Sequence, residues 1–326
     1  MDIDRKWRAP TVEGLNARAW SLCDQLAGEA DRLRVRVHAQ SGQMRVLDCG
    51  VQAEGGLEAG VKLAEICLAG HGHVQLAAAS DEMPWPRVLV YTDQPVLACM
   101  ASQYAGWQLT ADGFFAMGSG PMRSAASYEE LIKELGYSER PGRVVGVLET
   151  AKLPPAAIAE KIAAACGVAP GDITLAVART ASLAGTLQVV ARSVETALHK
   201  LHALGYDLTR VVSGLGTAPL PPVAADDLTA LGRTNDAILY GADVTLWVRD
   251  TDESLRGMGP QLPSAASSAF GQPFLRLFEQ AGRDFYRIDP HLFSPARVTL
   301  INLGTGRLFR YGVPRPDILR QSFEAE

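Results

Sequence analysis

Apolar and polar residues alternate along LRVRVHAQ (33–40), and they alternate again along MRVLDCGV (44–51) after the turn SGQ. A period of two places every second side chain on one side of an extended chain, so the two stretches predict a β-hairpin with one buried face. A second hairpin is predicted near the C-terminus, where ARVTLINL and GRLFRYGV surround the turn GTG.

Between the hairpins, stretches with helical spacing alternate irregularly with strand-like stretches. The helix predicted over 54–70 could carry an i,i+4 ion pair between Glu58 and Lys62 and end at Gly70. Irregular alternation with hairpins at both ends favours a mixed α/β (α+β) fold over a regular parallel one. The further helices are predicted over 127–137 with a Ser N-cap, over 154–167 and around 188–200, and the strands over 73–80, 87–93, 143–150, 172–178 and 244–250.

The division of the chain into domains is only weakly marked. A chain of 326 residues suits one large domain or two smaller ones, and no internal repeat or long linker separates them. The best candidate for a domain boundary lies near residues 150–156. It predicts an N-terminal lobe over 1–150 and a C-terminal lobe over 151–326, with an exchange of segments between the lobes left open.

The long helix predicted around 188–200 is amphipathic. At about 100° per residue, one narrow polar stripe carries Arg192 and Glu195, three residues apart. On a solvated face this pair would be an ordinary surface ion pair, which stabilises a helix only slightly. If the stripe instead lines a cleft, its side chains form a titratable cluster that can carry out acid–base chemistry, and the pattern permits both interpretations. The stripe consists of Gln188, Arg192, Glu195, His199 and His202, and it is flanked by Ser193, Thr196 and Lys200. The core face of the same helix consists of Leu187, Val190, Ala191, Val194, Leu198 and Leu201.

Composition and charge exclude several classes of protein. Hydrophobic residues make up 47% of the chain, enough for a substantial core, and the net charge is −5 with both signs mixed. No basic block indicates nucleic-acid binding. The charged N-terminus is unlike a secretory signal, and no window approaches the ~20 apolar residues of a membrane span. The five cysteines are widely spaced without a CxxC, which is typical of buried thiols in a reducing cytosol.

In the segment GFFAMGSGP (113–121), a Gly-rich stretch follows an aromatic pair and predicts a turn. The backbone amides of Gly118, Ser119 and Gly120 could cradle an anion or let a flat ring approach closely, or the segment could simply be a tight turn before the next helix. It is neither a Walker loop nor GxGxxG. No GxSxG or HExxH pattern occurs, so serine-nucleophile and zinc-hydrolase mechanisms have no support.

Two other segments carry candidate binding residues. SQYAGW (102–107) brings Gln103 and Tyr104 close to Trp107 in sequence, and such aromatic residues suit either a heterocycle or the core. In GRTNDAILYG, polar side chains either read a pterin or purine edge or cap a helix. An HxH pair with no third ligand nearby is a weak metal signal, so no metal site is predicted. The polar residues of the second segment are Arg233, Asn235 and Asp236, and the HxH pair is His71 and His73.

Several of these segments, taken in order, resemble the methenyltetrahydromethanopterin cyclohydrolase family. They are GGLEAGVKLAEICLAG, PVLACMASQYAGW, FFAMGSGP, SLAGTLQVVARSVETALHK and GRTNDAILYG. The resemblance extends from about the first hairpin to the FSPA segment (Phe293–Ala296), and several ordered segments are more specific than any single motif. It implies a cytoplasmic enzyme of one-carbon metabolism that hydrolyses 5,10-methenyl-tetrahydromethanopterin to the 5-formyl form without a cofactor.

The family fold implied by this resemblance is two α/β lobes with a large pocket between them, assembled as a homotrimer. The family's proposed catalytic arginine and glutamate correspond to Arg192 and Glu195. At Tyr104, archaeal relatives often have a lysine, and this departure points to a bacterial carrier with a different tail and to formaldehyde oxidation. The implied substrate-binding residues are Gln103, Tyr104, Trp107, Gly118, Ser119, Gly120, Gln188, Arg233, Asn235 and Asp236.

The implied reaction needs little from the protein. A methenyl bridge between two nitrogens is an amidinium-like cation, so its carbon is already electrophilic. Glu195 is the only carboxylate of the stripe and would take the proton of the attacking water, while Arg192 would hold it in place and offset the effect of burial on its pKa. Two alternatives remain: a pterin- or folate-binding enzyme with different chemistry, which the missing dinucleotide fingerprint disfavours, and a non-catalytic reduced-pterin carrier.

Overall fold

A computed structural model of the chain describes residues 14–39, 42–81, 83–104, 106–111, 113–126, 130–137 and 139–324. These residues form two compact units, and each is described by itself. The first unit comprises residues 14–73 and 96–189, and the second comprises 74–95 and 190–324, within the described ranges. The chain therefore passes between units after residues 73, 95 and 189, whereas the sequence predicted a boundary after residue 150.

The first unit is built on a six-stranded mixed sheet with the order β1-β2-β8-β7-β6-β5. The central strand β8 is parallel to both β2 and β7. The antiparallel pairing of β1 with β2 confirms the first predicted hairpin. The strands are β1 (Arg36–His38), β2 (Arg45–Gly50), β5 (Trp107–Ala111), β6 (Phe114–Ser119), β7 (Val144–Glu149) and β8 (Ile173–Ala178).

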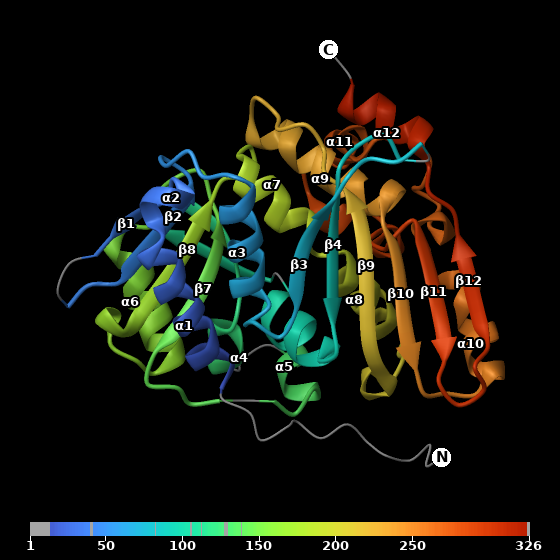
Figure 1. Cartoon of the computed structure of the whole chain (residues 1–326), viewed down its shortest axis with the longest axis horizontal. Helices are drawn as coiled ribbons and strands as arrows, with labels where there is room; N and C mark the ends of the chain where they lie inside the picture. Colours follow the sequence, from blue (N-terminus) through green and yellow to red (C-terminus); the bar gives the residue numbers. More distant parts are fainter. Residues whose placement is uncertain are drawn as a thin grey trace. The chain divides into compact units, whose positions relative to one another are not determined.

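Helices pack on this sheet through apolar side chains. α1 and α3 contact each other and β7, and they lie side by side over the sheet in Figure 1. α6 contacts β5 and β8, and its Ile158 and Ile162 are buried in a cluster with Leu175 and Val177 of β8. The helical elements are α1 (Leu15–Gly28), α2 (Ala30–Leu33), α3 (Leu57–Cys67), the π-helix η1 (Val96–Gln103), α4 (Met122–Ala126), α5 (Glu130–Glu134), α6 (Ala156–Cys166), η2 (Pro170–Asp172) and α7 (Leu183–Val190).

Several predictions for this unit need correction. The predicted pair Glu58–Lys62 does not form, because Arg32 donates to Glu58 and the ammonium of Lys62 lies 3.5 Å from a carboxylate oxygen of Glu29. α3 ends at Cys67, three residues before the predicted end, and Gly70 closes the following turn at a φ of +64°, with its N–H donating to the carbonyl of Glu65 at 2.8 Å. The segment read as a Gly-rich turn is mostly strand β6, with the turn itself confined to its end. The Ser N-cap predicted for the helix over 127–137 lies outside the described residues.

The second unit contains another six-stranded mixed sheet, with the order β12-β11-β10-β9-β4-β3. β10 and β11 are parallel, whereas β9 is antiparallel to both of its neighbours, β10 and β4. The antiparallel pairing of β11 with β12 confirms the predicted C-terminal hairpin, and Figure 1 shows these strands in their order. The strands are β3 (His73–Ala77), β4 (Arg87–Thr92), β9 (Val211–Pro219), β10 (Asp243–Val248), β11 (Arg297–Asn302) and β12 (Leu308–Gly312).

α8 packs on β4, β9 and β10, and α9 packs against α11, α12 and β9. The long helix predicted around 188–200 is divided: α7 ends at Val190, Ala191 and Arg192 form a turn, and α8 begins at Ser193. This break coincides with the passage of the chain from the first unit to the second. The helices are α8 (Ser193–Ala203), η3 (Leu208–Arg210), α9 (Asp227–Gly241), α10 (Asp252–Met258), η4 (Gly259–Gln261), η5 (Ser264–Ala266), α11 (Phe274–Gln280), η6 (Phe285–Arg287), η7 (Pro290–Leu292) and α12 (Pro316–Phe323).

Among the described residues, no helix combines the length and the apolar character needed to cross a membrane. All five cysteines are free thiols, and four of them are buried.

Candidate active site

The predicted catalytic pair lies at the N-terminal end of α8. Arg192 is the N-cap residue, and Glu195 is the third residue of the helix. Glu195 is only 7% exposed, and Arg192 is half-buried, so the interpretation of this pair as an ordinary surface ion pair is wrong. A carboxylate in the first turn interacts favourably with the positive end of the helix dipole. The start of α8 therefore presents a buried carboxylate close in sequence to a guanidinium.

The predicted division of this helical segment into a core face and an exposed face is half right. The core face is confirmed, since Val194, Leu198 and Leu201 are fully buried. The polar arc is not simply solvated, because Gln188, Ser193 and Lys200 are buried as well, at 3%, 0% and 1% exposure. Burying polar side chains costs free energy unless they have partners. These three residues therefore have a structural or functional role and do not simply face solvent.

Lys200 joins α8 to the segment that follows α11. Its ammonium donates to the backbone carbonyl of His291 at 2.8 Å and lies 3.1 Å from the Nδ1 atom of that ring. Burial lowers the pKa of Lys200 to about 8, and the nearby carboxylate of Asp289 opposes this effect. No sequence pattern singles out this lysine, because the angular position of a residue on a helix does not reveal a neighbour from another element. Burial, together with the positive charges of His202 and Lys200, also lowers the pKa of His199, so this imidazole is held toward its neutral form.

The polar cluster of α9 has structural partners. The guanidinium of Arg233 donates to the backbone carbonyls of Ser322 and Pro222, and the amide of Asn235 donates to the carbonyl of Leu231. Its three residues lie inside the helix, so the interpretation as a helix cap is wrong.

The carboxylate of Asp236, also in this cluster, is fully buried and accepts from the N–H of Phe274 at 2.8 Å. Burial raises the pKa of Asp236 to about 7. The N-cap of α9 is Asp226, whose carboxylate accepts from the N–H of Thr229. Contact of the α9 cluster with substrate stays a prediction.

In the first unit, three predicted residues converge on the thiol of Cys67. The amide of Gln188 donates to the Cys67 sulfur at 3.6 Å, and the hydroxyl of Ser119 lies 3.3 Å from it. The carbonyl oxygen of Gln103 lies 4.0 Å from the same sulfur, and Ser102 donates to the Cys67 carbonyl at 2.7 Å. From the sequence, Cys67 was predicted only to be a buried thiol. Its three contacts come from η1, β6 and α7, which no local pattern links.

The aromatic segment and the Gly-rich segment also meet. Trp107 of β5 lies directly opposite Gly118 of β6 in the ladder. Gly120 follows with a φ of +88°, a conformation that suits glycine. Arg123 is fully buried; its guanidinium lies 4.7 Å from the centre of the Tyr104 ring and donates to the Tyr104 carbonyl. Arg123 was not among the predicted site residues. The only sequence signal for it was its position three residues after Gly120.

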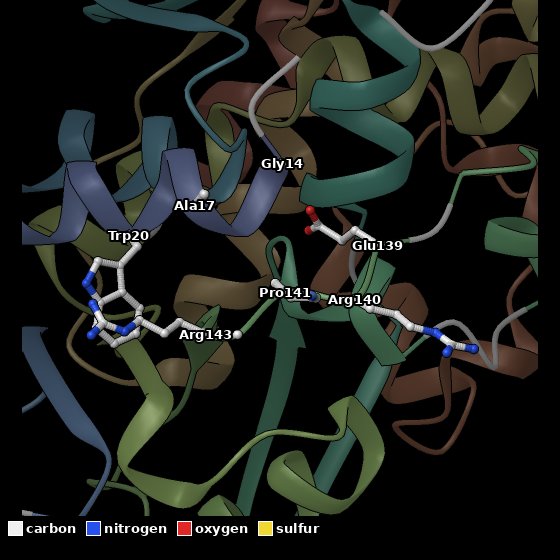
Figure 2. Close-up of a pocket in the computed structure, with 8 residues that line it drawn as sticks. Gly14, Ala17, Trp20, Glu139, Arg140, Pro141 and Arg143 are labelled. Atoms are coloured by element: carbon white, nitrogen blue, oxygen red, sulfur yellow. The ribbon is translucent and has the colours of Figure 1, made fainter. Parts of the chain in front are cut away.

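A surface concavity of about 620 Å³ lies elsewhere in the first unit, next to the start of α1. Figure 2 shows Arg143 extending toward Trp20, and its guanidinium lies 5.0 Å from the centre of the indole ring. The Glu139 carboxylate accepts from the backbone N–H of Asn16 at 3.1 Å. None of the predicted site residues lines this concavity. Within the described part of the chain, no group of three or more His, Cys, Asp or Glu side chains is placed to hold a metal ion.

Comparison with known proteins identifies the family. The sequence profile of the family described as Cyclohydrolase (MCH) matches residues 14–323. A protein of Methylobacterium sp. (strain 4-46) named methenyltetrahydromethanopterin cyclohydrolase is 48% identical over 95% of this chain and 97% of its own length. Proteins of the same name from Xanthobacter autotrophicus and Methanosarcina barkeri (strain Fusaro / DSM 804) are 49% and 39% identical, over 93% and 95% of this chain and 90% and 98% of their own lengths. The chain therefore belongs to the cyclohydrolase (MCH) family.

Proposed function

We propose that this protein hydrolyses 5,10-methenyl-tetrahydromethanopterin to 5-formyl-tetrahydromethanopterin in one-carbon metabolism. The family match over residues 14–323 and the names of relatives that are up to 49% identical support this activity. The structural observation that carries it is the buried carboxylate of Glu195, three residues after Arg192, in the first turn of α8. The substrate is a cation, and a buried anion favours the binding of positive charge.

The proposed steps follow from the chemistry of the substrate. Water adds to the methenyl carbon, and Glu195 takes one proton from this water, which leaves a neutral tetrahedral intermediate. Because the product carries its formyl group on N5, the bond that then breaks is the one to N10. Protonated Glu195 returns its proton to N10, and the hydroxyl proton leaves to solvent as the carbonyl forms. Arg192 holds the carboxylate in the required orientation and favours its ionised form.

The electrophile in this scheme is the amidinium-like carbon itself, so the scheme calls on neither a metal ion nor a covalent nucleophile. We further propose a cytoplasmic homotrimer, a role in formaldehyde oxidation, and pterin contacts by the candidate residues of β5, β6, η1, α7 and α9. Five free thiols support a reducing compartment. The chain is 48–49% identical to the Methylobacterium and Xanthobacter proteins and 39% identical to the Methanosarcina protein. The proposed role in formaldehyde oxidation rests on the departure at Tyr104.

The test follows the loss of methenyl absorbance when the protein is added to methenyl-tetrahydromethanopterin, with methenyl-tetrahydrofolate in parallel. Rapid loss with the first compound supports the proposal. Loss with folate alone contradicts the carrier assignment, and tight binding without hydrolysis supports the alternative of a non-catalytic pterin-binding protein.

The role of Glu195 is tested by Glu195→Gln, which keeps the size of the side chain and removes the base. We expect the variant to bind substrate and to lose most turnover, by about 10²-fold or more, since general bases contribute about 10²–10⁴-fold. Glu160→Gln, on the exposed face of α6, is the matched control and should turn over like the wild type. Near wild-type turnover by Glu195→Gln would show that another group is the base.

A further inference from the structure

Two glycines of β9 face the helix that carries the candidate catalytic pair. Gly214 and Gly216 are buried, and two residues apart on a strand they share one face. A Cβ atom on Gly216 would lie 2.4 Å from the Ser193 hydroxyl and 3.0 Å from a methyl of Val194, and a Cβ on Gly214 would lie 2.7 Å from another methyl of Val194. Real Cβ atoms essentially never make contacts of 2.4 Å or 2.7 Å, so the first turn of α8 packs where only glycine fits without a shift.

The strand requires glycine at these positions for space and not for backbone conformation. Neither residue has a positive φ, so alanine could adopt the same backbone without strain. β9 also has little freedom to move away, because Gly216 is paired with Val244 of β10 on one side and with Val90 of β4 on the other. A side chain added at Gly216 would therefore have to be accommodated on the helix side, by the side chains of Ser193 and Val194 and by the first turn of α8 that carries them.

Ser193 is the helix residue that meets Gly216. It directly follows Arg192 and precedes Glu195 by two positions, so a displacement of Ser193 moves both members of the pair. Its hydroxyl is buried and has no hydrogen-bond partner among the described residues. Removing this hydroxyl therefore breaks no hydrogen bond, which makes Ser193 a suitable site for a compensating substitution.

We propose that Gly216 is a positioning residue for the reaction, because it sets the depth at which the first turn of α8 packs on the sheet and thereby places Arg192 and Glu195. This inference rests on the proposed function. A Cβ on Gly216 would have to lie about 3.4 Å from the Ser193 hydroxyl instead of 2.4 Å, which requires a shift of up to about 1 Å in the turn unless the hydroxyl rotates away. Displacements of that size in a catalytic arrangement cost on the order of 10²-fold in rate.

The experiment is a double-mutant cycle of Gly216→Ala and Ser193→Ala, with kcat, KM and Tm measured for each protein. We expect Gly216→Ala to lower kcat by about 10- to 100-fold with a smaller change in KM. Ser193→Ala alone should keep kcat within about twofold of the wild type. The double variant should regain at least half of the loss in log kcat. The 2.4 Å contact with the Ser193 hydroxyl is then gone, and the remaining contacts of the Cβ at position 216 are 3.0 Å and 3.2 Å.

The control separates positioning from general destabilisation. Ile318→Val removes one methyl group from a fully buried residue of α12, and α12 packs on α9. It should lower Tm and leave kcat unchanged. An unaltered kcat in Gly216→Ala, or a double variant no faster than Gly216→Ala, would overturn the proposal.

Wild-type turnover and the Glu195→Gln variant are measured in the same series. An inactive wild type would end the proposed function and the role of Gly216 together. An active wild type with a normal Gly216→Ala variant would end only the role of Gly216.

Discussion

Asp236 should make the stability of this protein fall as the pH rises toward neutrality. Its carboxyl is fully buried on α9, where it accepts a hydrogen bond from the N–H of Phe274, and burial raises its pKa from 3.8 to about 7. Between these two values the folded state holds a proton that the unfolded state has released. The free energy of unfolding therefore decreases as the pH rises through this window, and the contribution of the protonated carboxyl is lost above pH 7.

The size of the effect follows from the two pKa values. Between pH 5 and pH 8 this one group should lower the free energy of unfolding by about 3 kcal/mol, since each pKa unit corresponds to about 1.4 kcal/mol. Asp236→Asn removes the ionisable group and keeps an oxygen that can accept from Phe274. The stability of the variant relative to the wild type should therefore rise by about the same amount over this range.

Urea unfolding of both proteins at pH 5, 6, 7 and 8 measures this difference directly. Asp226→Asn is the matched control, because it makes the same chemical change at the exposed N-cap of the same helix, where asparagine caps as well as aspartate. A stability difference between Asp236→Asn and the wild type that stays constant from pH 5 to pH 8 would refute the reasoning.

Two further predictions concern the backbone of the first unit. The buried carboxylate of Asp48 accepts hydrogen bonds from four consecutive backbone N–H groups, those of residues 50–53. Asp48→Asn should therefore lower the free energy of unfolding by about 2–4 kcal/mol, measured by urea titration. An unchanged urea midpoint would contradict this account of the loop. Gly167 ends α6 at a φ of +70° with no atom near its missing Cβ, so Gly167→Ala should cost about 1–2 kcal/mol through backbone strain alone. Gly28→Ala, at the equally open end of α1 without a positive φ, should be neutral or stabilising, and equal losses in the two variants would argue against strain.

Local patterns predicted the elements whose signal lies within the element itself. The alternation in 33–51 predicted the hairpin of β1 and β2, and the apolar spacing around Val194 and Leu198 predicted the buried face of α8. β9 was not predicted as a strand, because glycines at alternate positions weaken the strand pattern. The same glycines are explained only by the helix packed against them.

The candidate site shows the same limit. The sequence singled out Arg192 and Glu195 from their spacing and from the family resemblance, but it placed them within one continuous helix. Their position at an N-cap and in a first turn appeared only with the structure. The contacts of Lys200 with His291, and of Cys67 with Gln188, join residues 91 and 121 positions apart, which no window of local sequence can connect.

The sequence by itself determined the periodicity of the elements, the mixed α/β class and the family, because backbone conformation and side-chain spacing act over a few residues and several ordered segments identify a family. Only the tertiary structure decided that Glu195 is buried, that α7 and α8 are separate helices, and that the chain passes between two units after residues 73, 95 and 189. Burial and packing depend on the residues brought next to a side chain, and those residues come from distant parts of the chain.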